Sequence, residues 1–241
     1  MLRKTGLSRF MLCNDAFLGV PAGCPGGAGI CAINGTGSTV AAVDHSDTLL
    51  QVGGVGDVSG DFGGGSWYGM RAISAVYHEL FKLGRPTVMR EMLFALLGIS
   101  NKDEYHDAVT DGVANGTIRG VALSSIVFNA ADSGDEIALS ILRESSDNYA
   151  GAISWLAREL DFPVSRTLYV TFIGSVFVKE RVRILPQLIE RRVHEHLGER
   201  PVEFLSLKAP PVAGAVLWAA RSVGFDADPE SVCAKLAEAG L

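Results

Sequence analysis

The stretch GICAINGTGSTVAAV, residues 29–43, decides the fold that we expect for this chain. Residues 29–33 and 39–43 are short apolar runs of the kind found in strands. Between them lies Asn34-Gly35-Thr36-Gly37-Ser38, which has the composition of a tight connection. The pattern predicts a β-hairpin with the hydroxyls of Thr36 and Ser38 at its tip.

This predicted tip has the chemistry of a phosphate-binding loop. Gly35 and Gly37 allow backbone N–H groups to point at phosphate oxygens, and the hydroxyls of Thr36 and Ser38 can donate as well. It is not a Walker-type loop, because no Gly-Lys-Ser/Thr follows it. A flexible polar tip without a ligand is the alternative interpretation.

A second glycine-rich segment, GGVGDVSGDFGGGSW, covers residues 53–67. Its glycines let the backbone bend around a compact polar ligand, and Asp61 can accept hydrogen bonds from hydroxyl groups. The helix expected from Trp67 would add a positive N-terminal end. The alternative is a glycine-rich entry loop with no ligand.

Upstream of the hairpin, residues 10–13 form a short apolar run that we interpret as a buried strand ending at Asn14-Asp15. Folds of the α/β class place ligand chemistry at the carboxyl ends of strands, and Asp15 could accept a proton from a hydroxyl group there. An aspartate that only forms a turn is the alternative.

The remaining elements favour an α/β fold, a mixed sheet flanked by helices. Apolar residues at spacings of three and four predict a helix over residues 67–83. A layer of further helices is expected over residues 88–97, 102–113, 118–131 and 135–160. The run TLYVTFI, residues 167–173, is typical of a central strand.

After that strand, Gly174-Ser175 forms a turn into a helical stretch that reaches His196, and Pro186 should kink or split it. We expect a last short strand over residues 203–207, and closing helices over 212–223 and 229–239.

Composition limits the classes of function. The 241 residues are 48% hydrophobic and 20% charged with a net charge of -6, which indicates a globular protein of one large or two small domains. This charge gives no basic face for nucleic acid, and no apolar stretch is long enough to span a membrane. Small molecules are the expected partners.

Four cysteines lack zinc-type spacing, so we expect free thiols and no metal site. Three basic residues precede residues 10–13, as in an export signal, but Asn14-Asp15 ends the apolar run too early. We therefore expect a cytoplasmic protein. His194 and His196 would face different sides of a helix, His45 would be solvated, and Trp155, Phe172 and Trp218 would pack in the core.

The order of these segments is more specific than any one of them. NDAFLGVPAGCPGGAGICAINGTGSTV and GGVGDVSGDFGGGSWYGM together resemble the N-acetylglucosamine kinase-like branch of the BadF/BadG/BcrA/BcrD ATPase family. Members typically show an N-D-A block, a GTGS hairpin, then G-G-W-G and G-D-E-G-S. The resemblance continues through GRPTVMREMLFALLGIS, AADSGDEIALSIL, FIGSVF and PPVAGAVLWAA. It implies a ribonuclease H-like lobe of the actin-type ATPases.

The resemblance also implies roles for particular residues. Asp15 becomes the catalytic base, and the ligands are ATP, Mg²⁺ and a sugar such as N-acetylglucosamine or glucosamine. The implied ATP-binding residues are Gly35, Thr36, Gly37, Ser38, Gly174, Ser175 and Lys179. The implied sugar-binding residues are Asn14, Asp15, Gly54, Val55, Gly56, Asp57 and Asp61.

Departures from the family pattern qualify this expectation. Phe62 stands where the family has Glu, and Val55 where Trp is common. The family's D-G-G-G-T first phosphate loop is absent from residues 1–241, which we therefore interpret as the C-terminal lobe. A separate N-terminal lobe, or a homodimer, is an expected partner.

Three functions remain open from the sequence. The first is phosphorylation of a hexosamine, incomplete without an N-terminal lobe. The second is an ATPase that activates an iron–sulfur dehydratase or reductase, although the cysteine spacing offers no obvious match. The third is a non-catalytic nucleotide-binding remnant, which Phe62 and the missing N-terminal lobe favour.

Overall fold

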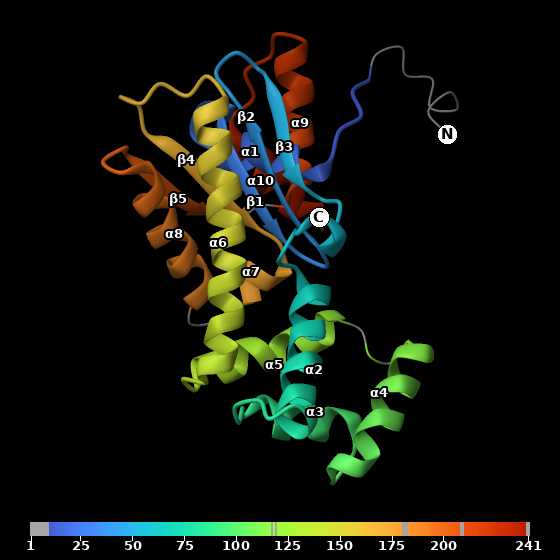
Figure 1. The fold of residues 1–241 in the computed structure, drawn as a ribbon. Helices are drawn as coiled ribbons and strands as arrows, with labels where there is room; N and C mark the ends of the chain where they lie inside the picture. Colours follow the sequence, from blue (N-terminus) through green and yellow to red (C-terminus); the bar gives the residue numbers. More distant parts are fainter. Residues whose placement is uncertain (1–9, 117, 119, 180–182, 208–209, 240–241) are drawn as a thin grey trace.

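The protein is described here by a computed structural model that covers residues 10–116, 118, 120–179, 183–207 and 210–239. The export-like basic segment lies outside these residues. A mixed five-stranded sheet runs in the order β3-β2-β1-β4-β5, as Figure 1 shows. Strands β3, β2 and β1 are antiparallel, whereas β1, β4 and β5 are parallel. The predicted mixed sheet is confirmed.

The predicted hairpin forms β1 (Gly29–Asn34) and β2 (Ser38–Val43), with Asn34 paired to Ser38 at the tip. The Gly35 N–H donates to the Gly37 carbonyl at 3.0 Å, which closes the connection. The predicted central strand is β4 (Leu168–Ile173), and it pairs with β1. Because β1 and β4 are parallel, Asn34 and Ile173 end at the same edge of the sheet.

Both edges of the sheet are short, half-exposed strands. The predicted last strand is β5 (Val202–Ser206). The other edge, β3 (Leu49–Gly53), was missed in the sequence, because its five residues merge into the glycine-rich segment that follows.

The strand expected over residues 10–13 is wrong. Phe10, Met11 and Leu12 are exposed and make no ladder, and helix α1 (Asp15–Gly23) follows directly. The Asn14 side chain accepts a hydrogen bond of 2.9 Å from the Ala16 N–H, so Asn14 is the N-cap of this helix. Asp15 therefore begins a helix rather than ending a strand.

Helices cover the two faces of the sheet. On one face, α1 contacts β1 and β2 and packs on α9 (Val212–Ser222), which α10 (Pro229–Glu238) follows. On the other face, α6 (Glu136–Glu159) packs on the sheet and on α8 (Ile184–Leu197). A Cβ on Gly214 would collide with the Leu18 carbonyl oxygen, so only glycine allows the close approach of α1 and α9.

The other predicted helices form an extension at one end of the sheet rather than a covering layer (Figure 1). They are α2 (Gly65–Phe81), α3 (Met89–Leu97), α4 (Tyr105–Ala114) and α5 (Gly120–Asp132). Helix α2 packs on α5, and side chains of both belong to the large hydrophobic core.

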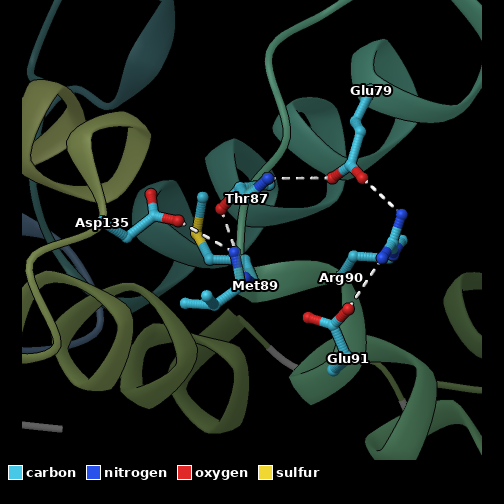
Figure 2. A network of polar contacts seen from close by, with 7 residues as sticks. Glu79, Thr87, Met89, Arg90, Glu91 and Asp135 are labelled. Atoms are coloured by element: carbon cyan, nitrogen blue, oxygen red, sulfur yellow. Dashed lines mark hydrogen bonds and ion pairs between the residues drawn. The ribbon is translucent and has the colours of Figure 1, made fainter.

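A polar network holds the turn between α2 and α3, as Figure 2 shows. The Glu79 carboxylate accepts hydrogen bonds from the Thr87 N–H at 3.1 Å and from Arg90 Nη1 at 2.6 Å. Asp135, at the start of α6, accepts from the Val88 N–H at 2.8 Å. These contacts fix the extension to the helix that crosses the sheet.

Two further expectations need correction. The stretch after β4 divides into α7 (Ser175–Lys179) and α8, but Pro186 is the third residue of α8 and lies beyond the division. Proline is tolerated there because the first N–H groups of a helix have no partner within it. Trp155 is 47% exposed and does not pack in the core, whereas Phe172 is buried.

Further findings concern the cysteines, the histidines and the helices of the described residues. All four cysteines are free, and no cluster of His, Cys, Asp and Glu side chains could hold a metal ion. His45, His194 and His196 are exposed. In the described part of the chain, no helix has the length and apolar character needed to cross a membrane.

Candidate functional site

A cleft of about 570 Å³ lies at the hairpin tip. It gathers residues from the start of α1, from the hairpin, and from the glycine-rich segment before α2. The lining comprises Asn14, Asp15, Ile33, Gly35, Thr36, Gly37, Ser38, Thr39, Gly54, Val55, Gly56, Asp61, Gly63, Ser66 and Trp67. Three separate sequence motifs thus face one cleft.

The α1 N-terminus positions Asp15 at the cleft. Asp15 is the first residue of the helix, where a carboxylate is stabilised by the positive end of the helix dipole. The residue is exposed, and within the described chain no hydrogen bond or ion pair engages its side chain. The carboxylate is therefore accessible to a hydroxyl group in the cleft.

Helix α2 fixes the orientation of the hairpin tip. The Gly65 N–H donates to the Gly35 carbonyl at 2.7 Å, and the Ser66 N–H donates to the Thr36 carbonyl at 3.2 Å. The first two N–H groups of α2 therefore donate to the hairpin loop and are not available to a ligand. Thr36 and Gly37 are exposed residues, and their N–H groups have no partner among the described residues, so they can donate to an anion.

Close backbone contact joins the tip to the glycine-rich segment. A Cβ on Gly64, whose φ is 84°, would lie 2.5 Å from Gly37 Cα. A Cβ on Gly63 would lie 2.9 Å from Cε2 of Tyr149. Glycine at position 64 therefore lets the two loops meet, and glycine at position 63 leaves room for the Tyr149 ring of α6.

A buried polar network supports the tip from below. Asn34 is fully buried, its Oδ1 accepts from the Gly64 N–H at 3.0 Å, and its Nδ2 donates to the Tyr68 hydroxyl at 3.2 Å. That hydroxyl lies 2.6 Å from Ser145 Oγ, which donates to the Phe62 carbonyl at 3.1 Å. No local sequence pattern indicates this network, because its members lie far apart along the chain.

Helix α6 adds two more contacts that sequence reasoning missed. The Tyr149 hydroxyl donates to the Ile33 carbonyl at 2.8 Å, and Asn148 Nδ2 donates to the Gly60 carbonyl at 2.7 Å. Burial raises the pKa of Tyr149 well above its ordinary value, so its hydroxyl keeps the proton that it donates. The hairpin and the glycine-rich segment are thereby held by one helix.

Asp61 closes the loop that borders the cleft. Its Oδ2 accepts from the Val55 N–H at 2.9 Å, the Gly56 N–H at 2.8 Å and Ser59 Oγ at 3.0 Å. In this structure the carboxylate shapes the loop, and it also lines the cleft. The Asp57 backbone begins a short 3₁₀ turn, and its side chain lies outside what the structure describes.

Comparison with known proteins assigns the family. The model of the BadF/BadG/BcrA/BcrD ATPase family matches residues 3–219. The chain belongs to this family. The match covers all the residues that line the cleft and ends within α9, before α10.

Two curated kinases are similar to this member of the BadF/BadG/BcrA/BcrD ATPase family. The N-acetyl-D-glucosamine kinase of Dictyostelium discoideum is 24% identical over 210 residues, which cover 87% of this chain and 65% of that protein. The N-acetylmuramic acid/N-acetylglucosamine kinase of Clostridium acetobutylicum is 25% identical over 221 residues, 91% of this chain and 70% of that protein. The chain thus spans about two thirds of the length of these relatives.

Two solved structures share the fold. A Chromobacterium violaceum protein provisionally named N-acetylglucosamine kinase aligns with a TM-score of 0.62 at 24% identity, over 88% of this chain and 66% of that one. A Porphyromonas gingivalis protein with the same provisional name aligns with a TM-score of 0.55 at 19% identity, over 85% of this chain and 64% of that one. The predicted actin-type ATPase fold of this BadF/BadG family member is confirmed.

Phe62, the departure from the family pattern, packs in an aromatic stack. Its ring lies 5.6 Å from that of Trp67 at an interplanar angle of 20°. The Arg71 guanidinium lies 5.4 Å from the Trp67 ring centroid and forms an ion pair of 2.6 Å with Glu144. Phe62 is not part of the cleft lining, whereas Trp67 is. Phe62 therefore supports Trp67, which forms part of the cleft wall.

The residues expected on the adenosine side lie beside the hairpin but outside the cleft lining. Gly174 has a φ of 104°, and a Cβ there would collide with the Asn34 carbonyl oxygen. Ser175 begins α7, and Lys179 is its last residue. The side chain of Lys179 lies outside what the structure describes.

Proposed function

We propose that this chain carries the acceptor and phosphate sites of an ATP-dependent sugar kinase, with N-acetylglucosamine or glucosamine as acceptor. One observation supports this most strongly: Asp15, the free amides of Thr36 and Gly37, and Asp61 line the same cleft. The names of the similar kinases supply the class of acceptor.

In this proposal Asp15 acts as the general base. Its exposed carboxylate takes the proton of the acceptor hydroxyl, and the hydroxyl oxygen becomes a better nucleophile. The N–H groups of Thr36 and Gly37, with the hydroxyls of Thr36 and Ser38, hold phosphate oxygens at the tip. ATP supplies the phosphoryl group that is transferred.

The acceptor would lie between Asp15 and the loop closed by Asp61. Gly54, Val55 and Gly56 expose backbone there, and Trp67 adds an apolar wall. We include Mg²⁺ as a cofactor held chiefly by the phosphates, since Mg²⁺ binds through few protein carboxylates in such sites. Gly174, Ser175 and Lys179 remain candidates for the nucleotide side.

We propose further that residues 1–241 form the C-terminal lobe and that a second lobe completes the site. Phosphoryl transfer needs donors on both sides of the transferred group. The hairpin tip supplies the donors on one side. A D-G-G-G-T loop on another chain or another segment would supply the donors on the other side.

The test is ATP-dependent phosphorylation of N-acetylglucosamine and of glucosamine by the chain with a recombinant N-terminal lobe. We expect turnover in the mixture and its loss in Asp15→Asn, with Asp107→Asn as the matched exposed control. A mixture without turnover would contradict the proposal. Turnover in the mixture would exclude a non-catalytic remnant, whereas ATP binding by the isolated chain would show only that the nucleotide site is kept.

A further inference from the structure

A second hollow, of about 700 Å³, lies between the end of α1 and the closing helices α9 and α10. It shares no lining residue with the cleft around Asp15. Its volume is within the range of small-molecule sites in proteins. The hollow therefore qualifies as a separate binding site if its walls offer specific chemistry.

Two aromatic side chains line one side of this hollow. Trp218 belongs to α9, and Phe225 lies in the turn after it with 65% of its surface exposed. Residues 21–27 form the opposite wall. An exposed phenylalanine beside a tryptophan offers a flat ligand an apolar surface on which a ring can lie.

Arg221 provides a cation at the same place. Its Nη1 lies 3.1 Å from the point where a Cβ on Gly27 would be, so the glycine leaves room for the guanidinium. No ion pair or hydrogen bond of the Arg221 side chain occurs among the described residues. By contrast, Arg90 and Arg192 each pair with carboxylates. The Arg221 guanidinium is thus available to an anion from outside the chain.

Other polar groups at the hollow define the ligand further. Asp226 also lines it, and this carboxylate is not in an ion pair with Arg221. It can accept a hydrogen bond from an N–H or O–H group of a ligand. Burial raises the pKa of the Cys24 thiol in the wall to about 12, so that thiol adds no negative charge that would repel an anion.

We propose that this hollow binds a small aromatic anion, whose acidic group pairs with Arg221 and whose ring lies against Trp218 and Phe225. A hydrogen-bond donor on the ligand faces Asp226. This site is independent of the proposed kinase cleft.

Two fluorescent probes test the proposal on the full chain. 1-Anilinonaphthalene-8-sulfonate is an aromatic anion with one N–H donor, and N-phenyl-1-naphthylamine is its neutral counterpart. Arg221→Gln should weaken binding of the anionic probe about tenfold, the loss expected for one charge-assisted hydrogen bond, and change binding of the neutral probe less than about twofold. Ala227→Trp, which fills the hollow, should weaken binding of both probes.

Arg85→Gln removes an exposed arginine elsewhere and is the matched control. The proposal is overturned if Arg221→Gln and Arg85→Gln have equal effects on the anionic probe. It is also overturned if Ala227→Trp leaves both probes bound, since they would then occupy another surface. Urea unfolding confirms that each variant is folded, and ATP affinity measured on the same variants reports separately on the kinase cleft.

Discussion

The Gly64 N–H donates a hydrogen bond of 3.0 Å to Oδ1 of the fully buried Asn34. This bond joins the end of the first hairpin strand to the start of α2, thirty residues later. It sets the distance between the two loops that form the cleft. The position of the hairpin tip therefore depends on a buried amide.

Replacing Asn34 should destabilise the protein. Asn34→Ala leaves the Gly64 N–H without its acceptor and removes a donor to Tyr68, and an unsatisfied buried polar group costs about 1 to 3 kcal/mol. We expect a loss of about 2 to 3 kcal/mol in the free energy of unfolding by urea, with weaker ATP binding. Asn129→Ala, at an exposed position, serves as control, and equal stabilities of the two variants would contradict the network.

Asp61→Ala should loosen the loop at the cleft with little effect on global stability. The substitution removes the acceptor of the Val55 and Gly56 amides. Hydrogen exchange at these two amides should accelerate while exchange in the sheet stays unchanged. Affinity for the sugar should fall as well. Unchanged exchange at Val55 and Gly56 would show that Asp61 does not hold the loop.

Stability should decrease at alkaline pH because of two buried thiols. Burial raises the pKa of Cys24 to about 12 and that of Cys31 well above its ordinary value. Above about pH 8.5 the unfolded chain loses these protons while the folded chain keeps them, so each thiol removes about 1.4 kcal/mol per pH unit. The slope of unfolding free energy between pH 9 and 10.5 should become shallower in Cys31→Ala, and an unchanged slope would refute this assignment.

Leu83 offers a stabilising substitution. It has a φ of 56° after the end of α2 and a fully exposed side chain. A non-glycine residue in this conformation costs roughly 1 to 2 kcal/mol. Leu83→Gly should therefore raise the free energy of unfolding by up to about 1 kcal/mol, after the greater backbone entropy of glycine is subtracted. A lower urea midpoint for this variant would contradict the prediction.

The sequence predicted the elements whose signal is local. The β-branched run of β4 and the two strands around Gly35 and Gly37 need no distant partner to be identified. By contrast, α1 was missed because Pro21 and the neighbouring glycines hide a nine-residue helix. Residues 10–13 have the apolar character of a strand, but apolar character alone does not show whether a neighbouring strand is available to pair with them.

The residues that line the cleft could be predicted from the sequence, but the buried hydrogen bonds that hold them could not. Asp15, Thr36 and Asp61 each stood in a motif of recognisable composition, and the structure brings the three motifs together. Tyr68 and Ser145 belong to no such motif. A hydrogen bond between residues 77 positions apart leaves no pattern in either segment of the sequence. The sequence indicates these contacts only through the presence of polar residues on the apolar faces of the two helices.

The proposed function requires that the amides at the hairpin tip bind the terminal phosphates of a nucleotide. The most direct measurement follows the amide resonances of Thr36 and Gly37 by NMR while ATP or AMP is added. We expect large shifts of both resonances with ATP and small ones with AMP, which lacks the β- and γ-phosphates. Equal shifts with the two nucleotides, or no shift with saturating ATP, would contradict it.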